Sequence, residues 1–491
     1  MENTVRWTAR GLALGAVLGL FLAVPARAVP VPGGSVDPMT IPKYVIPLVI
    51  PPVMPASSDT ATPAADYNIA VRQFGQQILP GGLWNALSGR SDGFGPTTVW
   101  SYGRAEDPLP AGGVAPAPDS SFNYPAYTIE NLSGQMTKVR WINELVENPD
   151  ACFHGTPTGT DCSFLPHLLP VDQTLHWANP PKADCVDHMG MLTDPNRTDC
   201  ETRNDAPYTG PVPMVVHVHG AHVNAASDGY PEAWWLPAAN NIDPSYATTG
   251  ALFSQWAPAN TVPGSAFYAY ENTQPATTIW YHDHSLGMTR LNVYAGPAGF
   301  WLIRGGAYDT AAGILPGPAP AAGDSVLELN APTLVEGTAD KRRVIREIPI
   351  VMQDRSFDYV DAGGNVLPDA GGATGTKLWY PASRTDFDGF VGPYITPFSE
   401  SDISGIWNPE AFFNTFVVNG VAWPYLDVAQ ERYRFRLLNG CNSRTLNLAM
   451  TVVSSPDAGL VGQELPFFQI GGDQGFLPKV AMIRTGFMAS L

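Results

Sequence analysis

The sequence predicts an all-β fold, and three observations support that prediction. From Tyr67 onward the chain is a series of short runs rich in β-branched and aromatic residues, such as "TTVWSYG" and "AGFWLIRG". Gly, Pro and Asn turns separate these runs, and no long stretch repeats its apolar residues at the helical period of 3.6. Glycine and proline number 48 each, which suits a loop-rich β protein better than a helical one.

Length and composition limit the classes of protein to consider. The chain has 491 residues, enough for two or three domains with full cores. Its hydrophobic content of 44% is that of a globular chain and excludes wholesale disorder. The net charge of −18 argues against nucleic acid and anionic membranes as partners, because both are negatively charged.

The N-terminus has the pattern of a secretory signal peptide over residues 1–28. Arg6 and Arg10 precede an apolar run of 13 residues, and Ala26-Arg27-Ala28 fits a small-x-small cleavage site. The run is too short to span a membrane, although an uncleaved N-terminal anchor is the alternative. We therefore expect an exported protein, periplasmic or secreted, cleaved near Ala28.

Export permits disulfides, and four of the five cysteines lie close together. Pairing Cys152 with Cys162 and Cys185 with Cys200 closes two short loops and is the preferred arrangement, although four cysteines allow three connectivities. Cys441 is left over, and its neighbours "RFRLLNGCNSRTLNL" predict a free buried thiol that acts as a small hydrophobe.

Composition divides the chain into five segments. The signal peptide is followed by a Pro-rich extended arm, because proline removes backbone donors from any sheet. A first β domain follows, interrupted by a polar insertion that carries the cysteines. A Gly/Ala/Pro-rich linker then leads to a second β-rich region. The predicted bounds are 29–64 for the arm, 65–305 for the first domain, 145–210 for its insertion, 306–343 for the linker and 344–491 for the second region.

Two His-x-His pairs are the strongest signs of chemistry. "VVHVHG" contains His217 and His219, and "TTIWYHDHSLG" contains His282 and His284. Residues i and i+2 of a strand share a face, so two adjacent strands of this kind would gather four imidazoles. Imidazole suits Cu, Zn, Fe and Ni. The pairs therefore predict a metal site. Asp283 is expected to point away from the histidines and Trp280 to share their face, and both are expected to surround the ligands without binding the metal themselves.

Five further histidines and two other classes of metal enzyme are the alternatives to this site. His222 is expected to pack in a turn. His154, His167, His176 and His188 lie in or near the insertion and are expected to be solvated or structural, with His176 the one to test. Coincidence is the alternative for a single His-x-His pair but fits two pairs on strands poorly. Copper proteins of the tyrosinase kind use histidines at helical spacings, whereas both pairs here have the strand period of two. The sequence also lacks the HExxH motif that would indicate a zinc hydrolase.

The sequence resembles the multicopper oxidases, in particular their three-domain branch of bacterial spore-coat laccases and bilirubin oxidases. The resemblance rests on several stretches in the family's order over most of residues 67–480: "VVHVHGAHVNAASDGYPEAWW", "TIWYHDHSLGMTRLNVYAGPAGFWLIR", "IPIVMQDRSFDYV", "FVVNGVAWPYLDV", "RYRFRLLNGCNSRTLNL" and "FQIGGDQGFLPKV". It implies tandem cupredoxin-like Greek-key β-sandwiches, the second incomplete here. It also implies one-electron oxidation of a donor coupled to reduction of O2 to water.

The resemblance further implies which residues bind copper. His217 resembles a type 2 copper ligand, and His219, His282 and His284 resemble ligands of the type 3 pair. The family's other ligands, including the Cys of its type 1 site, lie in motifs that nothing here matches, since all nine histidines lie at or before position 284. We therefore expect half of the trinuclear cluster, no type 1 copper, and no activity from this chain alone.

Three alternative hypotheses explain the incomplete set of copper ligands. The first is a laccase-like enzyme whose third domain and end of the second are absent, through a frameshift or premature stop. In that family, O2 and a small reducing donor are the partners. The second is an exported copper-binding module that pairs with a separate chain carrying the missing domain. The third is a non-functional truncated product with uncovered apolar surface and unpaired strand edges.

Overall fold

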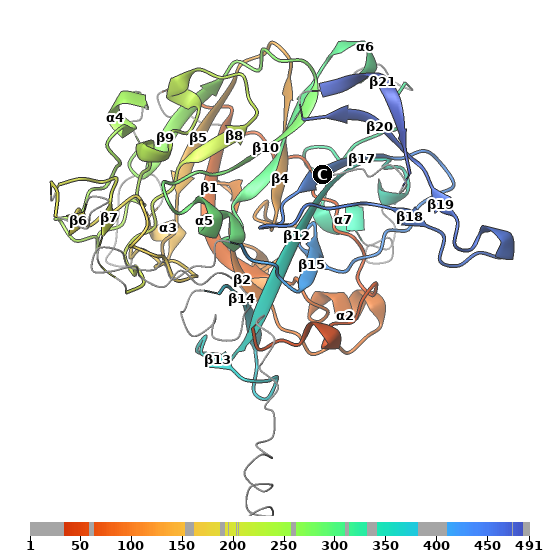
Figure 1. Ribbon diagram of the computed structural model, residues 1–491, viewed down its shortest axis with the longest axis horizontal. Helices are drawn as coiled ribbons and strands as arrows, with labels where there is room; N and C mark the ends of the chain where they lie inside the picture. The colour runs from red at the N-terminus through yellow and green to blue at the C-terminus, as the bar shows by residue number, and fades with distance from the viewer. Residues whose placement is uncertain are drawn as a thin grey trace, which may run out of the picture.

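The chain is built mainly of β-strands (Figure 1). The computed structural model describes residues 34–57, 63–152, 162–186, 192–194, 196–202, 204, 206–256, 262–309, 314–330, 341–381, 410–473 and 475–484. Within these ranges the longest helix, α5 (Thr289–Ala295), has only 7 residues, so the all-β prediction is confirmed. No helix in this part of the chain is long and apolar enough to cross a membrane. The expected signal peptide lies outside the described residues.

The strands follow one another along the chain with short helices between them. The strands are β1 (Tyr67–Gln76), β2 (Thr97–Arg104), β3 (Val114–Ala115), β4 (Ala126–Leu132), β5 (Thr137–Asn143), β6 (Cys185–Val186), β7 (Glu201–Thr202), β8 (Val216–His219), β9 (Ser265–Tyr270), β10 (Thr277–Asp283), β11 (Ala298–Arg304), β12 (Glu347–Val360), β13 (Val366–Leu367), β14 (Gly375–Trp379), β15 (Thr415–Val418), β16 (Val421–Ala422), β17 (Arg434–Asn439), β18 (Met450–Thr451), β19 (Glu464–Leu465), β20 (Phe467–Gly472) and β21 (Gly475–Ile483). The other helices are α2 (Leu83–Ser88), α3 (Pro149–Cys152), α4 (Phe253–Trp256), α6 (Gly306–Asp309) and α7 (Val326–Asn330).

Two sheets pack face to face in the first part of the chain. One contains β2, β1, β5 and β9 in that order, and the other has the order β4-β11-β10-β8. Their facing sides meet in a cluster of buried aromatic rings. Tyr281 on β10 lies 5.4 Å, centroid to centroid, from both Tyr102 on β2 and Trp141 on β5. Large buried aromatic rings contribute much of a core's apolar area, so this cluster fixes one face of β10 toward the interior.

The second β-rich region joins the first sheet through the long strand β12. The first half of β12 pairs with β15 and β17, and its second half pairs with β14, which in turn pairs with β2. The region also covers part of the outer face of the other sheet. Phe300 and Leu302 on β11 are buried there against Val351 on β12, with Leu438 on β17 beside them. The histidine-bearing end of β10 lies next to this contact in the same sheet.

The Pro-rich segment before β1 lies as an extended arm against the second region. Tyr44 and Leu48 donate backbone hydrogen bonds to the carbonyls of Trp423 (2.8 Å) and Tyr425 (2.6 Å). The side-chain amide of Asn419 donates to the carbonyl of Val49 (2.9 Å). The prolines prevent the arm from pairing its own backbone groups. Distant parts of the chain form hydrogen bonds with these groups instead.

An ion cluster links the two regions. The carboxylate of Glu347 at the start of β12 contacts Arg304 on β11 (2.7 Å) and Arg436 on β17 (2.6 Å). Asp309 on α6 contacts Arg434 (2.7 Å) and Arg436 (3.2 Å). Arg304 also pairs with Glu130 on β4, which balances the charges of the three guanidinium groups. Because most of these charged groups are buried, each needs an oppositely charged partner to offset the free-energy cost of losing its hydration.

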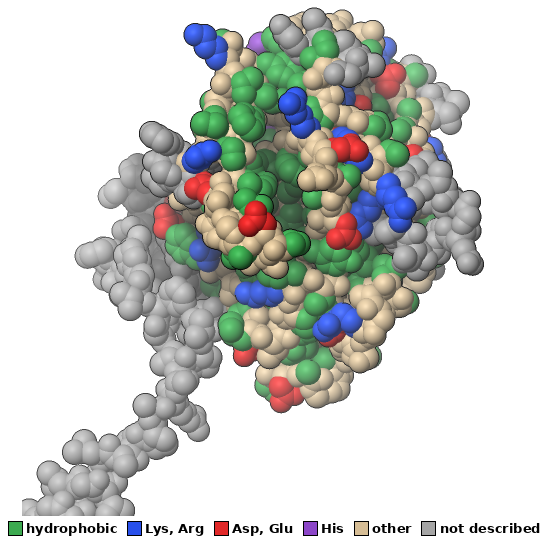
Figure 2. Space-filling view, turned by 90° about the vertical axis from the view of Figure 1, so that its right-hand side faces the viewer, with side chains coloured by type: hydrophobic (Ala, Val, Ile, Leu, Met, Phe, Trp, Pro, Cys, Tyr) green, Lys and Arg blue, Asp and Glu red, His purple; other side chains and the backbone are tan. Residues whose placement is uncertain are grey.

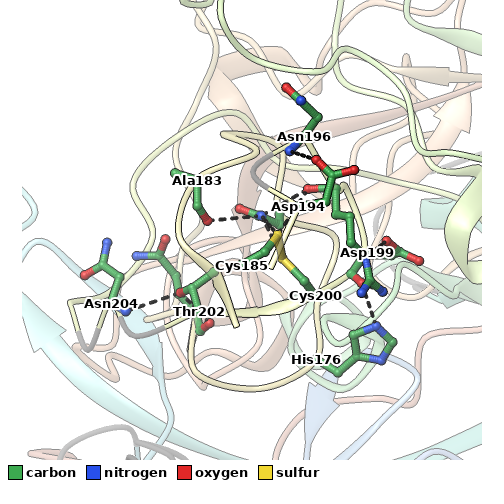
Figure 3. Close-up of a disulfide and its surroundings, with 12 residues drawn as sticks. His176, Ala183, Cys185, Asp194, Asn196, Asp199, Cys200, Thr202 and Asn204 are labelled. Carbon is green, nitrogen blue, oxygen red and sulfur yellow. Dashed lines mark hydrogen bonds and ion pairs between the residues drawn. A yellow bond between two sulfur atoms is a disulfide. The ribbon is translucent and has the colours of Figure 1, made fainter. Parts of the chain in front are cut away.

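Two disulfides stabilise the polar insertion. Cys152 is bonded to Cys162 and Cys185 to Cys200, the pairing that the short loops favour. Figure 3 shows the second bond between β6 and the start of β7, with His176 nearby at the carbonyl of Asp199. Its two sulfurs are buried and lie 3.0 and 3.3 Å from the side-chain amide of Asn179.

The last strands form two separate hairpins, β18–β19 and β20–β21. Within the described residues, nine large hydrophobic side chains of this segment are exposed: Met450, Val453, Leu460, Val461, Leu465, Phe468, Leu477, Val480 and Met482. Figure 2 shows the side of the molecule that carries the hairpins, with hydrophobic side chains gathered around a central hollow. Isolated two-stranded hairpins are marginally stable, so this face has the character of an uncovered half of a sandwich.

Candidate metal centre

Adjacent antiparallel strands bring the two His-x-His pairs together. In the register of β8 and β10, His217 lies opposite His282 and His219 lies opposite Trp280. His284 follows directly after β10, where its backbone N–H donates to the carbonyl of Val215 (2.7 Å). Side chains of paired residues share a face, so the four imidazoles lie on one side of the sheet. Tyr281, which lies between Trp280 and His282 in sequence, points into the core.

The four rings form one cluster. The ring of His217 lies 5.5, 5.7 and 5.2 Å, centroid to centroid, from those of His219, His282 and His284. His282 lies 5.6 Å from His219 and 5.7 Å from His284. The nitrogens approach most closely at 3.3 Å, between Nδ1 of His219 and Nε2 of His282. The structure therefore brings all four predicted ligands together.

The donor set suits a metal ion that prefers imidazole ligands. Bonds of about 2.0–2.1 Å to imidazole place two nitrogens on one tetrahedral ion about 3.3 Å apart, as His219 and His282 are. In the described part of the chain, no three His, Cys, Asp or Glu side chains converge on a single ion. Among the same residues, Nδ1 of His284 is buried with no hydrogen-bond partner. An imidazole nitrogen left in this state is a ready metal donor.

Burial favours neutral imidazoles in this cluster. It lowers the pKa of His282 to about 3 and also lowers the pKa of His217. Nδ1 of His217 lies 2.5 Å from the carbonyl oxygen of Asp228 and 3.6 Å from its carboxylate. A neutral ring that donates Nδ1–H to that carbonyl keeps the lone pair of Nε2 free for a metal.

Trp280 and Asp283 lie around the cluster as the strand pattern predicts. The indole ring of Trp280 stacks on His282 at 4.1 Å and on His219 at 5.5 Å. Asp283 is fully buried on the opposite side of β10, where burial raises the pKa of its carboxyl to about 6. Neither side chain is among the four clustered donors.

The sequence pattern does not point to three further residues around the site. Asp228, Ser285 and Asn292 all hydrogen bond to a histidine or to Asp283. Their own segments, "ASDGY" and "HSLGMTRLNVY", contain no metal-site spacing. Only the tertiary fold shows that these polar groups lie beside the metal motifs.

The remaining histidines lie away from the cluster. His167 is packed against Trp100 at 4.6 Å, and burial lowers its pKa to about 4, which agrees with a structural role. The side chains of His176 and His222 are exposed. His154 and His188 lie outside the described residues.

Cys441 is a free, half-buried cysteine, and burial raises the pKa of its thiol to about 12. Its backbone N–H donates to the side chain of Asn439 (3.1 Å) and its thiol lies 3.8 Å from the carbonyl of Met352. A thiol held protonated in this way is a poor metal ligand, since the thiolate is the binding form.

The chain is similar in sequence to known laccases and multicopper oxidases, although no family model matches it. A laccase from Bacillus stratosphericus is 29% identical over 387 residues, which are 78% of this chain and 47% of the relative. A laccase from Haloferax volcanii is 29% identical over 479 residues, 96% of this chain and 54% of the relative. A multicopper oxidase of Oryza sativa subsp. japonica is 32% identical over 273 residues, 56% of this chain and 33% of the relative.

Solved structures give a weaker likeness. The laccase from Pediococcus acidilactici covers 92% of this chain and 55% of its own, with a TM-score of 0.45 and 16% identity. The all-β architecture with two His-x-His pairs on adjacent strands is the one expected of cupredoxin-like sandwiches. The sequence relatives of the chain, which are laccases and multicopper oxidases, support the multicopper oxidase family. The chain spans about half the length of the curated relatives that it matches.

Proposed function

We propose that this chain supplies half of the copper cluster of a laccase-like oxidase, which couples one-electron oxidation of a small donor to reduction of O2 to water. The single observation that carries the proposal is the cluster of four imidazoles on β8 and β10, with ring centroids 5.2–5.7 Å apart in five pairs. Laccases among the sequence relatives support the choice of chemistry.

In this proposal His217 is the type 2 ligand, and His219, His282 and His284 are ligands of the type 3 pair. Copper, when bound, supplies one-electron redox chemistry at these nitrogens. The chain itself orients the rings: the Asp228 carbonyl fixes His217, and Trp280 stacks against His219 and His282. Imidazole donors suit copper, and a cluster of several ions suits the four-electron reduction of O2.

The cluster needs further donors from outside the described residues. The type 1 site requires a thiolate with two histidines, and Cys441 has a protonated thiol and no neighbouring histidine. The described residues therefore offer no type 1 site at which electrons from a donor could enter. We propose that this chain alone is inactive and that the other ligands belong to the part of a laccase-like enzyme that this chain does not span, with O2 and a small reducing compound as substrates.

A second candidate is an exported half-site module that acts with a separate chain. The exposed side chain of His219 and the apolar face of the hairpins β18–β19 and β20–β21 favour it, because both remain open to a partner. The two disulfides and the N-terminal segment support export. The net charge of −18 supports a partner other than nucleic acid or an anionic membrane.

Copper titration tests this function. The purified chain is expected to bind Cu(II) with nitrogen hyperfine coupling in its electron paramagnetic resonance spectrum, without an intense blue band and without oxygen uptake from a phenolic donor. His282→Ala is expected to lower copper affinity at least about tenfold, as loss of a metal-site contact does.

The matched control is His176→Ala, which removes an exposed imidazole outside the cluster and should leave copper affinity unchanged. Equal affinity in the wild type and His282→Ala would contradict the assignment of the site. A blue, oxygen-consuming preparation of this chain would contradict the proposal that its ligand set is incomplete.

A further inference from the structure

Both histidine motifs are tied to one buried carboxylate, that of Asp283, which is 0% exposed. Its Oδ1 accepts hydrogen bonds from the backbone N–H of Val215 (3.0 Å) and the hydroxyl of Ser285 (2.9 Å). Its Oδ2 accepts from the backbone N–H of Ser285 (3.1 Å) and the side-chain amide of Asn292 (2.7 Å). Four donors thus satisfy the carboxylate, and all four are neutral groups.

The positions of these donors matter for the site. Val215 lies two residues before His217, and Ser285 directly follows His284. One side chain therefore hydrogen bonds to the backbone just before the first histidine motif and just after the second. Hydrogen bonds to a buried charged group are stronger than neutral ones, so the carboxylate limits how far β8 and β10 can shift against each other.

Asn292 on α5 is itself held in one orientation. Its Oδ1 lies 2.9 Å from Nε2 of His167, while Nδ1 of His167 accepts the backbone N–H of Leu169 (2.9 Å). Nε2 of His167 must then carry the proton and donate to Asn292. The amide nitrogen of Asn292 is left to face Asp283, and a flip of the amide would lose both contacts.

We propose that Asp283 is a positioning residue, oriented by Asn292 and His167, that sets the relative placement of the two imidazole pairs before a metal binds. The proposal deepens the proposed function and rests on it for the identity of the metal. It assigns a role to a residue that never touches copper, and it links the polar insertion, which carries His167, to the metal motifs.

Asp283→Asn is expected to keep the fold but to replace one carboxylate oxygen with a donor that faces other donors. Copper affinity, measured by competition with a chelator, should fall about 10–100-fold, the usual effect of losing a contact that orients a ligand. The copper hyperfine pattern should change as well, because the imidazoles no longer share one arrangement.

The matched control is Asp354→Asn on β12. Asp354 is also 0% exposed and also accepts three hydrogen bonds, from Phe413, Asn442 and Arg444, but it does not contact the histidine motifs. It should destabilise the fold to a similar degree and leave copper affinity and spectrum unchanged. An equal loss of affinity in both variants would overturn the positioning role.

A rescue variant separates positioning from general damage. In Asp283→Asn combined with Asn292→Asp, the new amide can donate to the new carboxylate, and His167 can still donate to residue 292. We expect this double variant to recover part of the lost affinity and to move the hyperfine pattern back toward that of the wild type. Recovery is partial because the backbone N–H of Ser285 still faces a donor and the carbonyl of Pro213 loses its donor. Failure to recover either would overturn the proposal.

A metal-free measurement keeps this test distinct from that of the proposed function. In the metal-free protein, ring nitrogen and proton signals of labelled histidines should shift at His217, His282 and His284 in Asp283→Asn but not in Asp354→Asn. Unchanged signals would overturn the positioning role, whatever metal the site holds. Shifted signals in a chain that binds no copper would overturn the copper assignment alone.

Discussion

Replacing Glu347 with alanine is expected to lower the unfolding free energy by about 3–5 kcal/mol, the usual result of removing one member of a buried ion pair. Glu347 contacts both Arg304 and Arg436, whose side chain is only 4% exposed. Without it, three guanidinium groups would share two carboxylates across the contact between the two β regions. Denaturant unfolding followed by tryptophan fluorescence would measure the loss.

The matched control is Glu431→Ala, at a surface ion pair. Glu431 contacts Arg346 at 2.6 Å, but its side chain is 58% exposed. Solvent screens such pairs, so we expect a much smaller change in unfolding free energy. Equal losses in the two variants would show that burial of the ion cluster contributes nothing.

The same cluster predicts acid sensitivity. Burial alone would raise the pKa of Glu347, but the guanidinium groups of Arg436, Arg304 and Arg434 outweigh it and hold the pKa below its ordinary value. Asp309 follows the same rule with Arg434 and Arg436. A lowered folded-state pKa contributes stability above the unfolded pKa, roughly 4, and that stability is lost as the pH falls through the folded pKa. In Glu347→Ala this loss with acid should be shallower.

The second large effect is expected at the disulfide between Cys185 and Cys200. Replacing both cysteines with serine should lower the unfolding free energy by about 3 kcal/mol, because a bond that closes a loop of about 15 residues restricts the unfolded chain by that much. Differential scanning calorimetry under non-reducing conditions would measure the fall in Tm. The imidazole cluster should survive, since neither sulfur contacts it.

Cys441→Ser is the control for this pair. It removes a half-buried thiol that forms no disulfide and should change Tm only slightly. If the double serine variant keeps the wild-type Tm, the insertion is held by its packing around Trp177 and Tyr208 instead, whose rings lie 4.9 Å apart.

Much of the fold and of the histidine cluster follows from local sequence pattern. The spacing of His217 with His219, and of His282 with His284, fixes which face each ring takes because the strand period is two. The aromatic and β-branched runs fix the strands for the same reason. Both signals lie within a few residues, so they can be read without knowing the tertiary structure.

Other features depend on contacts between distant residues and give no local signal. Asn292 approaches Asp283 only because α5 packs against β10, and nothing in "TRLNVY" marks it. Glu347 meets Arg304 only once the two β regions join. A short sequence can encode the polarity of such residues, but the partner that neutralises each charge is set by the assembled fold.

The placement of the N-terminal arm has a consequence for biosynthesis. Tyr44 and Leu48 pair with the backbone of Trp423 and Tyr425, about 380 residues later in the chain. At ~5–20 residues per second, a ribosome needs on the order of 20–75 s to deliver those partners after the arm has emerged. The arm can therefore take its place in the fold only after Trp423 and Tyr425 have been synthesised.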